Sequence, residues 1–319
     1  MILNIILLIV GFALLIKGAD ILVDGSASLA KKLGLSSLMI GLTVIAFGTS
    51  APELIVNIFA SISGSSDIGM GNIIGSNISN ILLILGVAAI ICNLEVDDSI
   101  VKKQIPFSIL SVIALFILIN ATLINGYGQD GLSRSGGFIL ILFFLIFLYY
   151  TFSLARGQKS DDTEGIKEMK PLKSTAFISI GIIGLFIGGK LIVDSATAIA
   201  LNAGLSEAFI GLTIVALGTS LPELAASVVA ARKKQMQMAV GNVIGSNIFN
   251  LLWVLGLSAV IRPIVYNPAM NFDILFLIFV STLLFGLIYM GKKLYFTRKE
   301  GYILVFLYIV YILFISVRG

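Results

Sequence analysis

The chain has 319 residues, of which 58% are hydrophobic and 12% are charged, and its mean hydropathy is +1.07. Soluble domains carry about 25% charged residues, so this composition indicates an integral membrane protein. The single cysteine excludes a disulfide scaffold, and the lack of histidine excludes Ser/His/Asp catalysis and HExxH zinc hydrolysis. The net charge of +4 comes from short basic clusters between apolar segments, so no nucleic-acid partner is expected.

Ten apolar segments are long enough to cross a bilayer, which requires about 20 residues in a helix. The first begins without a basic region and is expected to be retained, unlike a signal peptide. A charged stretch, 156–173, follows the fifth segment and is expected to be a solvated linker, against the alternative of a regulatory ion site. In chain order the segments are 2–24, 36–61, 69–92, 104–124, 135–155, 174–198, 206–230, 238–261, 271–290 and 300–317.

The lysines and arginines between these segments are distributed unevenly. Of the 21 basic residues, 16 fall on one side of a ten-span chain and 3 on the other, while Lys17 and Lys190 lie within segments. Because short cytoplasmic loops are enriched in Lys and Arg, the side with 16 is predicted to be cytoplasmic. Both termini are then expected outside a cell membrane, plasma or inner, and the linker from Arg156 to Lys173 inside.

A long internal repeat divides the sequence into two halves. Residues 41–86 and 211–256 align without a gap at an offset of 170 and are identical at 22 of 46 positions. Each half contains five apolar segments, so the second half must enter the membrane in the opposite sense. The sequence therefore predicts an all-α polytopic membrane protein with ten transmembrane helices, as two inverted five-helix repeats, 1–155 and 174–319, joined by the linker 156–173.

Each repeat carries a glutamate deep within an apolar segment, Glu53 in GTSAPEL and Glu223 in GTSLPEL. A charge at that depth costs at least about 2.5 kcal/mol unless it is compensated, so two equivalent acids indicate a function beyond tying helices together. A threonine and a serine stand four and three residues before each glutamate and share its helical face. The intervening proline is expected to loosen the carbonyls of 46–48 and 216–218.

A second motif, GNxxGSNxxN, occupies 71–80 and 241–250. Ser76 and Asn80 lie one helical turn apart on one face, as do Ser246 and Asn250. The repeated glycines allow close helix packing. The remaining asparagines fall on other faces and are expected to serve helix contacts or helix capping; they are Asn72, Asn77, Asn242 and Asn247.

The donors in the two motifs are carboxylates, hydroxyls, amide oxygens and carbonyls, without a thiolate or an imidazole. Hard cations such as Ca²⁺ prefer oxygen ligands of this kind, and Na⁺ accepts similar ones. Two ionised glutamates neutralise one Ca²⁺ or two Na⁺. Competition of these ions for one centre of limited charge is the physical basis of exchange.

At these residues the sequence resembles the sodium/calcium exchanger family of cation/Ca²⁺ antiporters, in a prokaryotic-type form without a large regulatory loop. The resemblance implies a secondary active antiporter that exchanges Na⁺ for Ca²⁺ by alternating access, with the first and sixth spans moving together. It implies no enzymatic activity, no cofactor and no obligate protein partner; Ca²⁺ and Na⁺ are substrates within the bilayer. The implied ligands are Glu53, Glu223, Thr49, Thr219, Ser50, Ser220, Ala46, Ala216, Ser76, Ser246, Asn80 and Asn250.

The sequence departs from the family at one position. Family members often have an aspartate at one of the positions that match Asn80 and Asn250, whereas both are asparagine here. Ion stoichiometry, electrogenicity and potassium dependence therefore stay open. The alternatives are an H⁺/Ca²⁺ antiporter, a K⁺-dependent Na⁺/Ca²⁺ antiporter and a cation channel that uses the same oxygens. An intramembrane hydrolase based on Ser50 or Ser220 lacks a histidine base.

Overall fold

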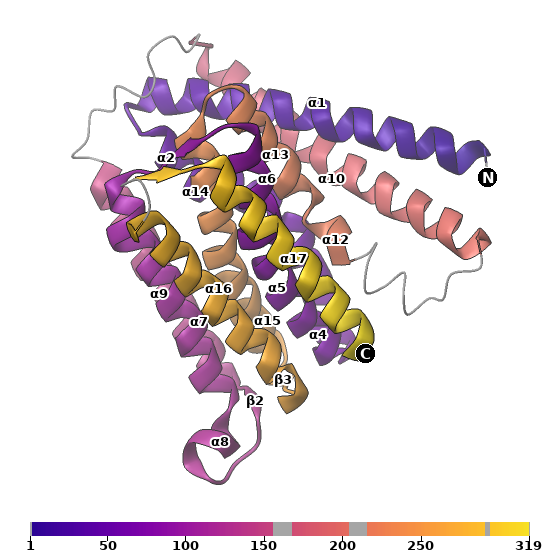
Figure 1. Ribbon diagram of the computed structural model, residues 1–319, viewed down its shortest axis with the longest axis vertical. Coiled ribbons are helices and arrows are strands. Elements are labelled where there is room, and N and C mark those ends of the chain that lie inside the picture. Colours follow the sequence, from indigo (N-terminus) through magenta and orange to yellow (C-terminus); the bar gives the residue numbers. More distant parts are fainter. Residues whose placement is uncertain (1, 156–167, 204–215, 291–293, 319) are drawn as a thin grey trace.

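The computed structural model describes residues 2–155, 168–203, 216–290 and 294–318, which form a bundle of helices (Figure 1). Within these residues, eight helices are long and apolar enough to cross a membrane, and a bent helix pair would make nine. An integral membrane protein of many helices is thus confirmed. The expected seventh span, 206–230, lies partly outside the described residues, so the number ten stays a prediction.

The elements of the first half follow the expected spans closely. The π-helical segments, labelled η, lie within the second and third of these spans and form the first turn of the fourth helix. The elements are α1 (Ile2–Leu33), α2 (Ser37–Ile40), η1 (Gly41–Ile45), α3 (Ala46–Thr49), α4 (Ala51–Ser63), α5 (Ser66–Ser79), η2 (Asn80–Ile84), α6 (Leu85–Ile91), β1 (Leu94–Glu95), η3 (Ile100–Gln104), α7 (Ile105–Ile119), α8 (Ala121–Asn125), β2 (Gly131–Leu132) and α9 (Arg134–Ala155).

The second half repeats much of this order at an offset of 170. Here η6 is π-helical and η7 is a 3₁₀ turn. The elements are α10 (Pro171–Asn202), α12 (Ala216–Thr219), α13 (Leu221–Arg232), α14 (Met236–Ile248), η6 (Phe249–Val254), α15 (Leu255–Ile261), β3 (Ile264–Val265), η7 (Pro268–Met270), α16 (Asn271–Met290), β4 (Tyr295–Phe296) and α17 (Arg298–Arg318).

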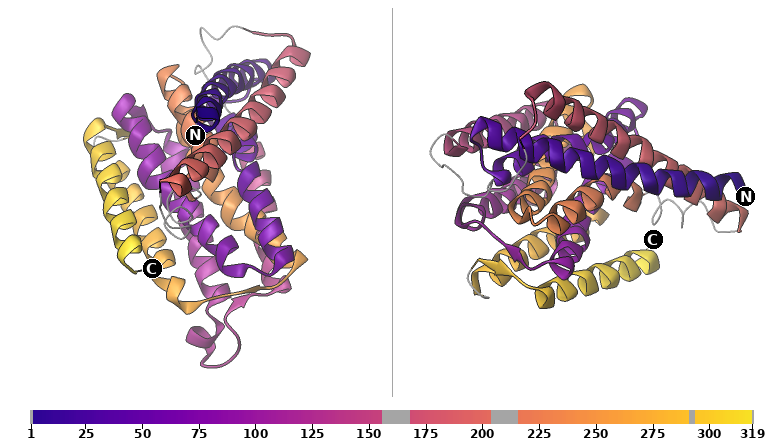
Figure 2. Two further views of the ribbon diagram at one scale, coloured as in Figure 1. Left: turned by 90° about the vertical axis from the view of Figure 1, so that its right-hand side faces the viewer. Right: turned by 90° about the horizontal axis from the view of Figure 1, so that it is seen from above.

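The two longest helices, α1 and α10, lie side by side across one end of the bundle (Figures 1 and 2). Glycines allow their backbones to touch: a Cβ atom at Gly18 would lie 2.9 Å from the carbonyl oxygen of Gly181, and one at Gly188 would lie 2.8 Å from that of Gly11. α1 continues to Leu33, beyond the expected end at 24, because its polar Ser28 is buried and hydrogen-bonds Ser174 of α10 at 2.9 Å.

A cluster of opposite charges connects α1 to the end of α13. Lys233 Nζ lies 2.6 Å from Asp20 Oδ1 and 2.6 Å from Asp24 Oδ1, and Lys17 Nζ lies 2.8 Å from Asp20 Oδ2. All four side chains are partly exposed. This cluster joins the α1/α10 pair to the rest of the bundle at the end where the basic loop 232–234 lies.

Two short strand pairs cap the bundle at opposite ends. Leu94 and Glu95 of β1 pair antiparallel with β4, and Ile264 and Val265 of β3 pair antiparallel with β2. β1 and β3 occupy equivalent positions in the internal repeat. In Figure 1, β2 and β3 lie at the bottom and the yellow strand β4 lies near the top. Equivalent segments of the two halves therefore lie at opposite ends of the molecule.

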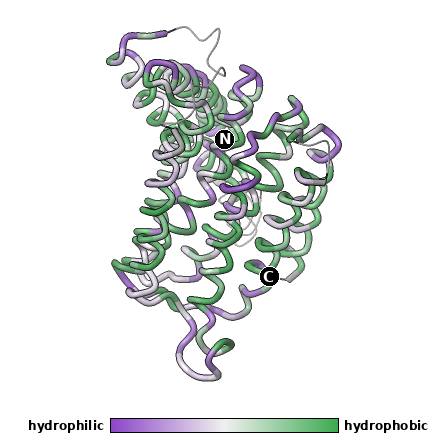
Figure 3. The backbone as a smooth tube through the Cα atoms, turned by 90° about the vertical axis from the view of Figure 1, so that its left-hand side faces the viewer, coloured by the Kyte–Doolittle hydropathy of each residue, from purple (hydrophilic) through white to green (hydrophobic). Residues whose placement is uncertain are grey.

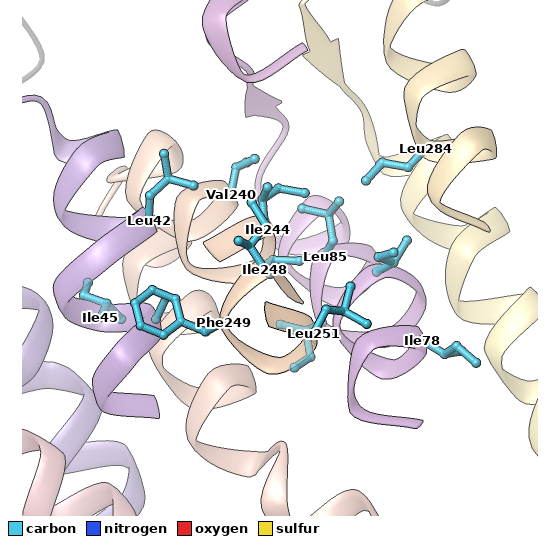
Figure 4. Packing of buried hydrophobic residues seen from close by; sticks show 14 of the residues in the cluster. Leu42, Ile45, Ile78, Leu85, Val240, Ile244, Ile248, Phe249, Leu251 and Leu284 are labelled. Atoms are coloured by element: carbon cyan, nitrogen blue, oxygen red, sulfur yellow. The ribbon is translucent and has the colours of Figure 1, made fainter. Parts of the chain in front are cut away.

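The apolar core lies between α14 and its neighbours. Ile244 and Ile248 of α14 lie between Leu42 and Ile45 of η1 on one side and Leu85 of α6 on the other (Figure 4), and all five side chains are buried. Hydrophobic residues also cover most of the outer helix surfaces, while hydrophilic ones gather toward the loops and helix ends (Figure 3). This distribution suits a protein whose outer surface faces lipid.

Candidate cation site

Two glutamates lie at the centre of the bundle with fully buried side chains. Glu53 is in the first turn of α4 and Glu223 is in the first turn of α13, and the exposed fraction of each is 0%. A helix N-terminus carries a partial positive charge, which stabilises a carboxylate placed there. Helix breaks directly before both residues create these N-termini within the bundle.

The breaks follow from the prolines one residue before each glutamate. α2–α3 and α4 meet at an angle of 46°. In the first half, the N–H of Ser50 donates to the carbonyl of Ala46 at 3.0 Å, and the ladder resumes with Leu54 N–H to Ser50 O at 3.1 Å. Because Pro52 has no N–H, the carbonyl of Gly48 loses its usual partner. In the second half, Ser220 N–H donates to Leu217 O at 3.2 Å.

The expected loosening of carbonyls before the prolines thus takes a specific form. The carbonyl of Ala46 stays in the helical ladder and also lies 3.4 Å from Thr49 Oγ1. Its repeat mate Ala216 begins α12, at the edge of the described residues. The prolines remove the helical N–H donor from the carbonyls of Gly48 and Gly218, four residues earlier. The carbonyls of Ala46 and Ala216 do not lose a donor in this way.

Serine hydroxyls reach the glutamate carboxylates from neighbouring elements. Ser50 Oγ donates to Glu223 Oε1 at 3.0 Å, which links the helix break of the first half to the acid of the second. Ser76 Oγ of α5 donates to Glu53 Oε1 at 3.3 Å. Both hydroxyls and both carboxylates are buried. The structure therefore forms two buried hydrogen-bonded pairs, Ser50 with Glu223 and Ser76 with Glu53.

The threonines of the motif contact asparagines from the opposite half. Thr49 Oγ1 donates to Asn242 Oδ1 at 3.1 Å and also lies 3.4 Å from Ser246 Oγ. Thr219 Oγ1 donates to Asn72 Oδ1 at 3.2 Å. Each half thus supplies the hydrogen-bond acceptor for the threonine of the other.

The asparagines at the ends of α5 and α14 form a crossed arrangement. Asn80 Nδ2 donates to Asn247 Oδ1 at 2.9 Å, and Asn250 Nδ2 lies 3.4 Å from Asn77 Oδ1. Asn80 begins η2 and Asn250 lies in η6, where π-helical turns shift the residues that follow. Such turns occur often at functional sites.

Several buried oxygens near the glutamates have no hydrogen-bond partner among the described residues. Oxygen atoms that accept no hydrogen bond are costly to bury, unless they bind a cation. The unpaired atoms that belong to expected ligands are Glu53 Oε2, Glu223 Oε2, Asn80 Oδ1, Asn250 Oδ1 and Ser220 Oγ. Two carboxylate oxygens, two amide oxygens and one hydroxyl form a donor set that suits a hard cation.

The site is less enclosed around Asn72 than around Asn242. Thr49, Asn242 and Ser246 are buried, with exposed fractions of 0%, 1% and 0%. Thr219 and Asn72 are only half-buried, and Gly71, next to Asn72, is exposed. The comparison applies to the described residues, since 204–215, which precede Thr219, lie outside them.

Sequence reasoning placed four asparagines on packing surfaces that the structure brings to the site. Asn72 and Asn242 bind the threonines, and Asn77 and Asn247 bind the asparagines of the second motif. The four asparagines do connect different helices, as expected. In each case, however, the bonded residue is one of the expected cation ligands. Duplication of all four in the repeat was the signal that could have identified them.

Comparison with known proteins yields one family. The family model described as "Sodium/calcium exchanger protein" matches residues 3–153 and 173–317. The chain is 36% identical over 320 residues to the putative antiporter CaxA of Alkalimonas amylolytica, covering 98% of each chain. It is 31% identical over 342 residues to the sodium/calcium exchanger MaX1 of Methanosarcina acetivorans, covering 97% of each. These matches confirm the resemblance found in the motifs.

Solved structures give the same result. The sodium-calcium exchanger NCX_Mj, soaked with Na⁺ and Ca²⁺, superposes on this fold with a TM-score of 0.82 at 34% identity, covering 97% of both chains. Agreement over nearly the whole length includes both halves of the repeat. The arrangement of helices around the two glutamates is therefore shared with an ion exchanger of known structure.

Proposed function

Because this chain belongs to the sodium/calcium exchanger protein family, we propose that it is a secondary active antiporter that exchanges Na⁺ for Ca²⁺ by alternating access. The observation that carries this proposal is the pair of fully buried carboxylates, Glu53 and Glu223, each with one oxygen unpaired among the described residues. Cation exchange by antiport is the activity of the family. The coupling to Na⁺ is the proposal's specific content.

The cation is bound by the two carboxylates and by neutral oxygens around them. Glu53 and Glu223 supply two negative charges, which match one Ca²⁺ or two Na⁺. Among the described residues there is no group of three or more His, Cys, Asp and Glu side chains, so the remaining ligands are uncharged. They come from Thr49, Thr219, Ser50, Ser220, Ala46, Ala216, Ser76, Ser246, Asn80 and Asn250, through side chains or carbonyls.

The proposed architecture is ten transmembrane helices in two inverted repeats, 1–155 and 174–319. The strand pairs support it, since the equivalent strands β1 and β3 lie at opposite ends of the bundle. The linker 156–173 joins the repeats on the cytoplasmic side, and both termini lie outside the cell membrane. The excess of basic residues on the linker's side supports this orientation.

In this orientation the structure corresponds to a state that is closed toward the cytoplasm. Thr49 and Asn242 lie toward the end of α13 where Arg232 and Lys233 are found, and they are buried. Thr219 and Asn72, on the other side of the glutamates, are half-buried. Exchange requires the opposite state as well, in which the Asn72 side closes and the Asn242 side opens.

Uptake of ⁴⁵Ca²⁺ into proteoliposomes tests the function. Vesicles are loaded with Na⁺, with K⁺ or with a proton gradient at matched osmolarity, and a vesicle without any opposing gradient serves as the control. We expect rapid uptake with internal Na⁺ and background uptake in the other three. Uptake driven by protons alone would identify an H⁺/Ca²⁺ antiporter, and uptake without a counter-ion gradient would identify a channel. A requirement for K⁺ together with Na⁺ would identify potassium-dependent exchange.

A further inference from the structure

The hydroxyl group of Thr49 has one proton and a clear acceptor for it. Asn242 Oδ1 lies 3.1 Å from Thr49 Oγ1, closer than the carbonyl of Ala46 or the hydroxyl of Ser246, which both lie at 3.4 Å. A hydroxyl that donates its proton in one direction keeps its oxygen lone pairs for other partners. The hydrogen bond to Asn242 therefore fixes the direction in which the lone pairs of Thr49 Oγ1 point within the site.

The orientation of the Asn242 amide is itself determined by its surroundings. Its Nδ2 donates to Ser227 Oγ at 2.9 Å and lies 3.3 Å from the carbonyl oxygen of Glu223. A carbonyl oxygen only accepts hydrogen bonds, so the nitrogen must face Glu223 and the oxygen must face Thr49. Asn242 thereby connects the helix break of the first half to α13, which carries the acid of the second half.

The first half contains the equivalent residues with fewer bonds. Asn72 Oδ1 accepts from Thr219, but Asn72 Nδ2 has no partner among the described residues. Asn57 occupies the position equivalent to Ser227; its Nδ2 donates to the carbonyl of Glu53 at 3.0 Å, while its Oδ1 is also unpaired there. Among the described residues, Asn242 is therefore held at three points and Asn72 at one.

We propose that Asn242 and Asn72 are positioning residues of the cation site, each of which orients the threonine of the opposite half toward the bound cation, with Asn242 the stronger of the two in this state. The inference rests on the proposed function, because it assumes that the threonines face the transported ion. It assigns a role in cation affinity to two residues whose position in the sequence indicates only helix packing.

Substitution by leucine tests this assignment, because leucine is similar in size to asparagine and offers no acceptor. Asn242→Leu should raise the KM for Ca²⁺ about tenfold, as expected for a buried hydroxyl that loses its partner, and Asn72→Leu should raise it only about threefold. In both variants the maximal rate should stay within about twofold of wild type, and the Tm should change little. Equal KM values for wild type and Asn242→Leu would overturn the proposal.

A double-mutant cycle separates positioning from packing. Thr49→Val removes the donor, so Asn242→Leu in that background should change KM less than about twofold. Asn242→Asp keeps an acceptor for Thr49 but loses the amide donor to Ser227 and to the carbonyl of Glu223, so it should recover only part of the affinity. The same change in the Thr49→Val background measures the effects that do not pass through Thr49. Additive losses in the cycle would show that Asn242 acts through packing and not through Thr49.

Binding without transport provides an independent measurement. A cation that binds the folded protein raises its Tm with concentration, which yields an apparent Kd for each variant. A wild type that is stabilised by Ca²⁺ or Na⁺ but does not exchange them would refute the proposed function, and the order of Kd values would then decide the role of Asn242. A wild type that neither cation stabilises would overturn both proposals.

Discussion

The two copies of the repeated motif differ in how firmly their polar side chains are held. Asn242 bonds Thr49, Ser227 and the carbonyl of Glu223 in a buried environment, whereas Asn72 is half-buried and, among the described residues, bonds Thr219 alone. The sequence motif is nearly the same in both copies. Ser227, however, has Asn57 as its repeat mate, so the difference lies partly in the sequence and partly in the packing around the motif.

The packing of the two copies differs in the same way. A Cβ atom added to Gly241 would lie 2.7 Å from the carbonyl oxygen of Leu38, because α14 contacts α2 directly. At the equivalent Gly71 no described atom lies within 4 Å, and the residue is exposed. One copy is thus closed by backbone contact, while the residues that the repeat places opposite Gly71, 208–212, lie outside the described ones.

Substitution of either glutamate should lower Ca²⁺ affinity by the same amount, because the two carboxylates are equivalent in the repeat. Glu53→Gln or Glu223→Gln removes one of two charges that face the cation. At about 4 Å and an effective dielectric constant of 20, a pair of unit charges interacts by about 4 kcal/mol, so roughly a thousandfold loss of Ca²⁺ affinity is expected from either change. The measurement is Na⁺-driven ⁴⁵Ca²⁺ uptake, with size-exclusion elution as the control for folding. Near-normal exchange by both variants would contradict the site.

Adding a charge should also affect both halves alike. Asn250→Asp and Asn80→Asp are nearly isosteric, and at alkaline pH each adds one negative charge to the site. A unit charge that crosses the whole membrane field contributes about 2.3 kcal/mol per 100 mV, so each variant should change the voltage dependence of exchange by up to this amount. Flux measured at imposed potentials tests this expectation. Wild-type voltage profiles in both variants would mean that positions 80 and 250 lie away from the transported charge.

Alanine substitution at the equivalent glycines should affect the stability of the two halves differently. Gly241→Ala forces a Cβ atom against Leu38 and should destabilise the protein by about 1–3 kcal/mol, as overpacking usually does. Gly71→Ala should be neutral or stabilise by up to about 1 kcal/mol, because alanine favours helix and no described atom lies within 4 Å of a Cβ atom there. Thermal denaturation in detergent measures both. Equal destabilisation by the two substitutions would argue that the described asymmetry is absent from the protein in solution.

The smallest effect is expected at the ion-pair cluster between α1 and α13. Its groups are partly exposed, and such pairs contribute about 1 kcal/mol or less, weakened further by salt. Lys233→Met should lower stability slightly at low ionic strength and not at high ionic strength. Ser63, the repeat mate of Lys233, carries no charge, so Ser63→Ala is a matched control without salt dependence. A salt-independent loss in Lys233→Met would point to packing of the side chain.

The membrane spans could be predicted from hydropathy to within a few residues in most cases. The expected span 238–261 compares with an observed helix from 236 to 261. The end of α1 was the clear error, since the expected span ends at 24 while the helix continues to Leu33, with Ser28 buried and hydrogen-bonded to Ser174 of α10. Hydropathy counts a serine as polar wherever it lies, whereas a helix partner with its own serine can satisfy the hydroxyl.

The sequence by itself determined that the protein lies in a membrane, that its halves are duplicated and that two acids are surrounded by oxygen donors. These properties depend on composition, on spacing along one helix and on identity between the repeats. Only the tertiary structure decided which donor meets which acceptor. Thr49 and Asn242 are 193 positions apart, and no local pattern encodes a bond of that span. The difference between the two halves depends on both, because the motif residues are alike while their neighbours, such as Ser227 and its repeat mate Asn57, differ.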